Sequence, residues 1–503
     1  MQLARAGGVL LHPTSLPSRY GIGDLGQEAR DFVDFLAESN LRLWQVLPLN
    51  PIGFGESPYQ SFSAFAGSPL FISLDELRQD GLVSGEQLKK VPSFPEEKVA
   101  YQACAEYKER IFRQAYASFL CGGKEGEKGA AYRCFVEKNS FWLADYALFM
   151  ALKRYFHNVP WNFWEKEIAL RQPAALKRWE SMLAAEIDYQ IFLQYEFFRQ
   201  WHNFRQYASA KGISLIGDLP IYVAYDSSDT WVNPRLFELD ELGNPLKVGG
   251  VPPDYFSATG QLWGNPIYKW RNMAENDYLW WRERIKVLLE LVDYIRIDHF
   301  RGFEAYWEIP GGELTAVNGR WVKGPAENFF QVITAYLGEL PLIAEDLGII
   351  TPAVVELKNK FGFPGMKVLQ FVDRESITER PLPGPEMMHT AETNYVYYTG
   401  THDNNTLRGW FEKKILAQLN KESREKWDQV ACEKICWEFI ETVMQSRAKW
   451  AIVPLQDFLC LGSSARMNQP GTVGGNWEWR CKKGALTGEL ARRISALVAK
   501  CGR

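Results

Sequence analysis

The segment GGVLLHPTSLPSRYGIGDLGQEARDFVDFLAESNLRLWQVLP, residues 7–48, shows the repeating unit from which we predict the fold. Residues 7–12 and residues 43–48 are apolar runs, each of which predicts a buried strand. A helical pattern lies between them at residues 27–40, with its apolar side chains on one face: Ala29, Phe32, Val33 and Leu36. A strand, a helix and a strand within about 40 residues form a βαβ unit, which predicts a parallel sheet.

The alternation of strand and helix continues to the end of the chain. Helical patterns at residues 278–291 and 326–337 each lead into an apolar run, and Thr351-Pro352 has the residue types that begin a helix. Eight runs predict strands: 7–12, 43–48, 213–218, 294–298, 342–345, 367–371, 395–399 and 451–455. This count favours a closed (β/α)8 barrel over an open doubly wound sheet, for which no Gly-x-Gly-x-x-Gly follows a strand.

Composition excludes several classes of protein. The 503 residues carry a net charge of −4 without long runs of one sign, which argues against nucleic acid as a partner. No apolar run approaches the roughly 18 residues of a spanning helix, and the N-terminus has too short an apolar segment for a signal peptide. We therefore predict a cytoplasmic protein with no membrane partner.

Cysteine and histidine patterns give no support for a metal or a cofactor. The eight cysteines form no Cys-x-x-Cys, and the six histidines form neither His-x-His nor His-Glu-x-x-His. We predict reduced thiols, no metal site and no cofactor. Aromatic residues are abundant at 14%, and ring faces beside polar loops suit the stacking of sugar rings as well as the packing of a core.

Four acidic residues end or follow predicted strands: Asp218, Asp298, Glu345 and Asp403. Because the carboxyl ends of barrel strands meet at one mouth, these side chains are expected to converge there. Such a cluster suits either a divalent metal or acid and nucleophile chemistry on a glycosidic bond. Arg296, two residues before Asp298 on the same strand face, favours the second, because it would keep that carboxylate charged and oriented. Glu345 follows an apolar run and would face other acids, which suits a proton donor.

Two segments beside these acids combine tight turns, aromatic rings and amides. They are residues 54–61 and residues 252–265, and the second contains Tyr255, Phe256 and Trp263. This composition suits a neutral polyhydroxylated ligand. The alternative is that the three rings pack the loop against the barrel.

Seven motifs, in order along the chain, resemble those of one family. They are HPTSLP (12–17), GESPY (55–59), DLPIYV (218–223), PDYF (253–256), RIDHFRG (296–302), AEDLG (344–348) and THDN (401–404). They resemble the 4-alpha-glucanotransferases, also called amylomaltases or disproportionating enzymes, of glycoside hydrolase family seventy-seven in the alpha-amylase clan. The resemblance implies one catalytic TIM barrel over residues 1–503, of the α/β class, with helical insertions between strands and no separate C-terminal β-domain. We place a helical insertion at about 75–158 and a substrate-loop insertion at about 225–275.

The resemblance also implies roles for individual residues. Asp298 would be the nucleophile, Glu345 the acid/base and Asp403 the third carboxylate of a retaining double displacement. Substrate-binding residues would be Tyr59, Asp218, Tyr255, Phe256, Trp263, Arg296 and His402. The expected partners are α-1,4-glucans, with glucose as an acceptor. Two alternatives are a glucan-binding protein on an inactive barrel, which would have no reason to keep the three acids together, and a plain hydrolase.

Overall fold

The computed structural model describes residues 4–123, 126–253, 257–371, 393–414 and 428–503. Its centre is a ring of eight strands in the order β10-β11-β12-β1-β2-β3-β6-β9, and every neighbouring pair is parallel. The N–H of Ala344 donates to the carbonyl of Pro364 at 2.8 Å and joins the two ends of this order. The strands are β1 Ala6–Leu10, β2 Leu43–Gln45, β3 Ser214–Pro220, β6 Tyr294–Asp298, β9 Leu342–Ala344, β10 Gly365–Val368, β11 Tyr395–Tyr398 and β12 Trp450–Pro454. The predicted eight-stranded barrel is confirmed.

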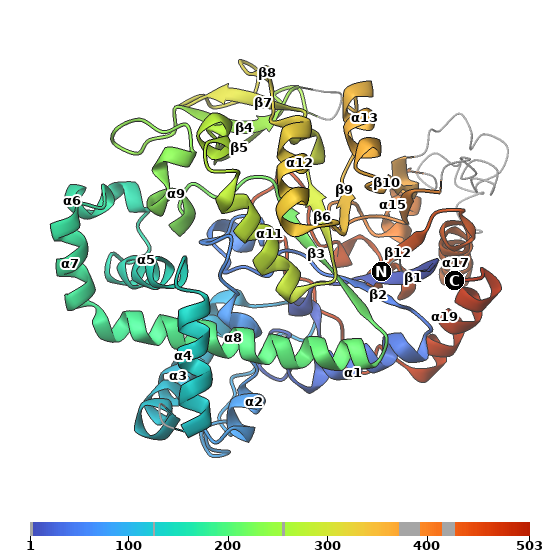
Figure 1. Cartoon of the computed structure of the whole chain (residues 1–503). Helices are drawn as coiled ribbons and strands as arrows, with labels where there is room; N and C mark the ends of the chain where they lie inside the picture. The colour runs from blue at the N-terminus through green and yellow to red at the C-terminus, as the bar shows by residue number, and fades with distance from the viewer. Residues whose placement is uncertain (1–3, 124–125, 254–256, 372–392, 415–427) are drawn as a thin grey trace.

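Helices follow the strands around the outside of the ring (Figure 1). Gly212, with φ of +72°, ends the helix before β3 in a conformation that side chains disfavour. Thr351 occupies the predicted N-cap position, but its side chain accepts no capping hydrogen bond. The outer helices are α1 Gln27–Glu38, α8 Ala184–Ala210, α11 Leu279–Leu291, α12 Ala326–Leu337, α13 Pro352–Lys360, α15 Leu407–Lys414, α17 Gln429–Gln445 and α19 Gly488–Lys500.

A helical region lies beside the barrel, against the long helix α8 (left in Figure 1). It comprises α2 Leu74–Gln79, α3 Tyr101–Ser118, α4 Gly126–Lys138, α5 Leu143–Tyr155, α6 Lys166–Ala169 and α7 Pro173–Met182. The Nζ atom of Lys108 in α3 donates to Asp24 at 3.1 Å, and both side chains are buried. This ion pair ties the region to the loop that follows β1.

A second, antiparallel sheet has the strand order β5-β4-β7-β8. Its strands are β4 Lys247–Val251, β5 Gln261–Pro266, β7 Ala305–Pro310 and β8 Arg320–Lys323. The predicted loop at residues 252–265 is wrong for residues 261–265, which belong to β5. The strands β4 and β5 contain glycine and proline, so their period-2 pattern is weak.

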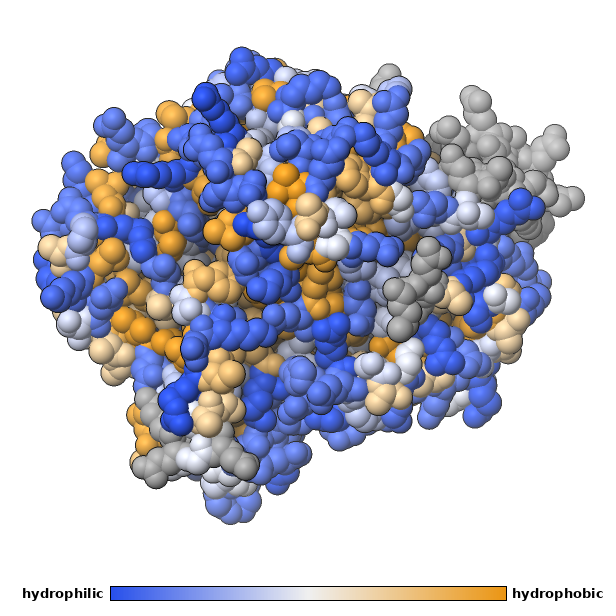
Figure 2. Space-filling view, in the orientation of Figure 1, coloured by the Kyte–Doolittle hydropathy of each residue, from blue (hydrophilic) through white to orange (hydrophobic). Residues whose placement is uncertain are grey.

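The first and last strands of the chain are neighbours in the barrel. All five residues of β1 pair with β12, and the Arg503 guanidinium donates to the carbonyl of Ala6 at 3.2 Å. The eight cysteines, all of which lie among the described residues, form no disulfide with one another. The visible face is largely hydrophilic, with apolar residues scattered over it (Figure 2). Within the described residues, no helix is both long and apolar enough to cross a membrane.

Candidate active site

Arg296 links two carboxylates at the mouth of the barrel. It lies opposite Asp218 in the pairing of β6 with β3, and its Nη1 donates to both oxygens of Asp218, at 2.8 and 2.7 Å. Its Nη2 donates to Oδ1 of Asp298 at 2.9 Å. Asp218 therefore lies inside β3, two residues before its last residue, and not at the strand end as predicted.

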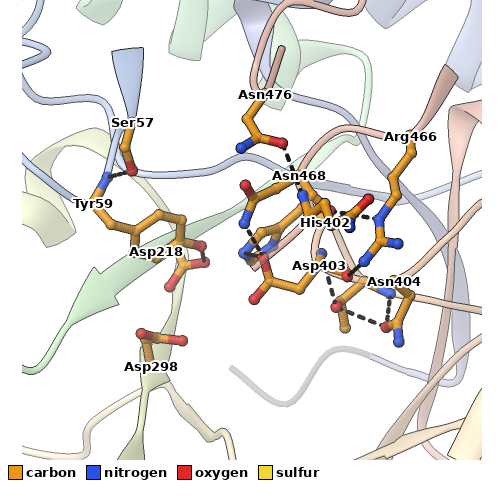
Figure 3. Close-up of polar contacts among 12 residues, drawn as sticks. Ser57, Tyr59, Asp218, Asp298, His402, Asp403, Asn404, Arg466, Asn468 and Asn476 are labelled. Carbon is orange, nitrogen blue, oxygen red and sulfur yellow. Dashed lines mark hydrogen bonds and ion pairs between the residues drawn. The ribbon is translucent and has the colours of Figure 1, made fainter. Parts of the chain in front are cut away.

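These neighbours differ in exposure. The side chain of Asp218 is 0% exposed and that of Arg296 is 5% exposed, whereas Asp298 is 30% exposed. The hydroxyl of Tyr59 donates to Oδ2 of Asp218 at 2.7 Å (Figure 3). Asp218 thus holds Tyr59 and Arg296 in place, while Asp298, the last residue of β6, keeps a carboxylate open to a ligand.

Glu345 follows β9 directly and is held by backbone N–H groups. Its Oε2 accepts from His299 N at 2.8 Å, and its Oε1 accepts from Leu347 N at 2.9 Å. Burial raises the pKa of Glu345 to about 7; Arg296 opposes this shift, and the charge of Asp298 adds to it. Glu345, whose carboxyl group has a pKa near neutral pH, therefore lies close to Asp298, whose carboxylate accepts a hydrogen bond from Arg296.

Asp403 faces the same space from the other side (Figure 3). Its side chain is 47% exposed, and its Oδ1 lies 3.4 Å from Nε2 of His402. Asn468 donates to Oδ1 of Asp403 at 2.6 Å, and Arg466 donates to the backbone carbonyl of Asp403 at 2.5 Å. Asn468 and Arg466 are not among the predicted site residues, although both contact this acid. Both residues belong to a polar segment shortly after β12. The sequence does not show that this segment lies beside Asp403, because the contact forms only when the barrel closes.

Two groups of aromatic rings border the acids. The ring of Tyr59 stacks on His402 with centroids 5.2 Å apart, and Trp477 lies 5.7 Å from each of them. On the other side, Trp263 in β5 meets His299 edge to face, with centroids 4.9 Å apart. Trp263 thus lies next to the residue that follows Asp298. Tyr255 and Phe256 lie outside the described residues.

His299 has an unusual backbone and an unusual pKa. It adopts a left-handed φ of +54°, and its Nε2 has no hydrogen-bond partner among the described residues. Burial lowers its pKa to about 4, and the neighbouring Asp298 opposes this shift. A neutral imidazole beside Asp298 can donate to or accept from a sugar hydroxyl. In the part of the chain that the structure describes, no three His, Cys, Asp or Glu side chains are placed to hold a metal ion.

Comparisons with known proteins identify the family of the chain. The 4-alpha-glucanotransferase family profile, glycoside hydrolase family 77, matches residues 11–487. The 4-alpha-glucanotransferase of Thermus thermophilus is 47% identical, and the alignment covers 99% of each chain. That of Synechocystis is 46% identical over 99% of this chain and 98% of its own. The structure of Streptococcus agalactiae amylomaltase in complex with acarbose superposes with a TM-score of 0.90, at 39% identity over 99% of both chains. The chain therefore belongs to the family of 4-alpha-glucanotransferases, enzymes that transfer α-1,4-glucan segments by a retaining double displacement.

Proposed function

We propose that Asp298 is the nucleophile of this transfer reaction, Glu345 the acid/base and Asp403 the carboxylate that holds the distorted sugar ring. The observation that supports this assignment most strongly is the contrast between two acids. Arg296 holds Asp298 at 2.9 Å, while burial raises the pKa of Glu345 to about 7. A pair of carboxyl groups in such different environments is the usual arrangement of a nucleophile and a proton donor.

In the first step, Glu345 protonates the glycosidic oxygen while Asp298 attacks the anomeric carbon from the opposite face. The C–O bond to the leaving glucan breaks, and a covalent β-glucosyl ester of Asp298 forms. A retaining mechanism requires the two carboxyl groups about 5–5.5 Å apart. Asp403, fixed by Asn468 at 2.6 Å, would accept hydroxyl hydrogens of the distorted ring.

In the second step, Glu345 is a carboxylate and removes a proton from the acceptor. A sugar 4-hydroxyl gives transfer, whereas water gives hydrolysis. Acceptors would be an α-1,4-glucan or glucose. Residues proposed to bind the sugars are Tyr59, Asp218, Tyr255, Phe256, Trp263, Arg296 and His402, with Asp218 acting through the Tyr59 and Arg296 side chains that it holds.

The decisive experiment compares Asp298→Asn and Glu345→Gln on two donors. With maltotriose, both variants should lose nearly all turnover while keeping the fold. With α-maltotriosyl fluoride, whose fluoride leaves without a proton, Glu345→Gln should recover formation of the maltotriosyl ester of Asp298, and Asp298→Asn should not. Glu356→Gln is the matched control, because Glu356 is an exposed acid on α13. Substantial activity of Asp298→Asn on maltotriose would overturn the assignment.

Product analysis separates transfer from the two alternatives. Maltotriose should give longer maltodextrins and glucose, with the number of reducing ends nearly constant. Rising reducing ends without longer products would indicate a hydrolase, and no change in a folded sample would indicate a binding protein. The cytoplasmic location and the insertions at about 75–158 and 225–275 stay predictions.

A further inference from the structure

A cavity of about 690 Å³ lies apart from the three candidate acids, among α5, α11 and the short helix α9 Ser228–Val232. These elements face one another above α8 in Figure 1. The volume falls within the roughly 300–1,000 Å³ typical of ligand pockets. None of the described side chains that are assigned to catalysis or substrate binding lines this cavity.

One wall of the cavity is aromatic. Phe65 stands at its centre, stacked on Trp142 at 6.2 Å and edge to face with Trp280 at 5.8 Å and Phe141 at 5.5 Å. Phe141 is 47% exposed, and Leu279 is 45% exposed. The wall therefore offers exposed apolar surface on a rigid base, on which a sugar ring can stack.

The rest of the lining is polar and nearly neutral in charge. Arg171 pairs with Asp145 at 2.6 Å, Arg235 and Glu283 bring one charge of each sign, and the buried Asp229 adds one acid. Asn233 and Asn276 add amide groups, which can donate to and accept from hydroxyl groups. Such a lining offers no net attraction to a strongly charged ligand and suits one that carries many hydroxyl groups.

The cavity and the candidate active site share one loop. Tyr59, which bonds to Asp218, and Phe65 of the cavity wall are six residues apart in the chain. Between them, Ala64 N donates to the buried Asp229 at 2.7 Å, and Ser228 N donates to the carbonyl of Phe62 at 2.8 Å. The loop of residues 59–65 is thus fixed at both sites. A glucan bound in the cavity and a sugar at the barrel mouth would therefore contact the same rigid part of the protein.

We infer that this cavity is a second binding site for an α-1,4-glucan, which holds a distant part of a long chain while another part of a glucan reacts at the barrel mouth. The aromatic wall stacks a glucosyl ring, and the polar lining bonds to its hydroxyls. The inference rests on the glucan-transferring activity of the family, and it does not depend on which acids are catalytic. Binding at two sites raises the effective concentration of a long substrate, whereas a short substrate gains nothing from the second site.

The test compares kcat/KM for soluble amylose with kcat/KM for maltotriose. Phe141→Ala removes the exposed ring, and Leu279→Trp fills the cavity from its rim. Phe163→Ala is the matched control, because Phe163 is a phenylalanine of the same helical region that is 73% exposed and does not line the cavity. Both cavity variants should lower kcat/KM for amylose by about 3- to 10-fold. They should leave maltotriose unchanged, and Phe163→Ala should change neither.

Two results would overturn the inference: no effect of either cavity variant on amylose, or an equal loss on both substrates. An amylose-specific loss in Phe163→Ala would overturn it as well. Titration calorimetry of the Asp298→Asn variant with maltoheptaose counts the binding sites. We expect two sites in this variant, and one site when Leu279→Trp is combined with it. Because the kinetic comparison uses enzyme with all acids intact, a failure of the cavity proposal is distinct from a failure of the catalytic assignment.

Discussion

The pKa of Glu345 predicts where activity is lost as the pH rises. A proton donor must be protonated to act, so activity is present below its pKa and is lost as the pH rises through that value. With a pKa of about 7, roughly 90% of Glu345 is protonated at pH 6 and roughly 10% at pH 8. The kcat/KM for maltotriose should therefore fall about ten-fold between these two pH values. At the ordinary glutamic acid value of 4.5, only about 3% of Glu345 would be protonated at pH 6, and kcat/KM would fall about 100-fold between pH 6 and pH 8.

Initial rates of glucose release at low maltotriose concentration measure kcat/KM, which reports the free enzyme. The buffer series needs constant ionic strength, and circular dichroism at each pH verifies the fold. α-Maltotriosyl fluoride is the internal control: its first step needs no proton donor, so the alkaline loss should be absent when ester formation is measured. Two results would refute the role of Glu345: an alkaline loss of activity that is the same with the fluoride as with maltotriose, or a kcat/KM for maltotriose that stays constant up to pH 9.

Four further predictions cover the third acid, the acceptor side, stability and metal dependence. Asp403→Asn should lower kcat on maltotriose about 100-fold or more with little change in thermal stability, and a kcat close to that of the parent would contradict its role. Trp263→Ala should reduce kcat/KM for maltoheptaose about ten-fold without changing stability, and an unchanged dependence on substrate length would indicate simple packing. Lys108→Met leaves Asp24 buried and unpaired and should cost about 3–5 kcal/mol in urea unfolding, whereas Lys89→Met, which breaks an exposed pair, should cost less than about 1 kcal/mol. Dialysis against EDTA should leave activity unchanged, and a loss that added metal reverses would show that the reaction needs a metal.

The barrel could be predicted because each of its strands is a short apolar run between polar or helical segments. Helix 326–337 has the predicted bounds, since a broad apolar face and Gly338 define it. The antiparallel sheet was missed because the local patterns of β4 and β5 are weak, and because β4 pairs with a strand distant in sequence. Gly249 and Gly250 of β4 pair with Glu308 and Trp307 of β7, a contact that no local pattern reveals.

The part of the candidate site that lies at the ends of the barrel strands could be predicted from the sequence. Asp298 and Glu345 are at the mouth because β6 and β9 end there, and Arg296 contacts Asp298 because the two residues are on the same strand face. The environment of Asp403 was not predictable, since Asn468 comes from 65 residues further along the chain. Burial, which dominates the pKa of Glu345, likewise depends on elements from the whole chain.

The pairing of β1 with β12 has a consequence for synthesis of the protein. The two strands are joined side by side, yet Ala6 and its partner Trp450 are separated by nearly the whole chain. Closing so long a loop is slow, and it cannot begin before the last strand has been made. Asn468, which fixes Asp403, is added later still. A chain whose synthesis has not passed Asn468 therefore has an unfixed third acid, so it acquires transfer activity only after that residue has been added.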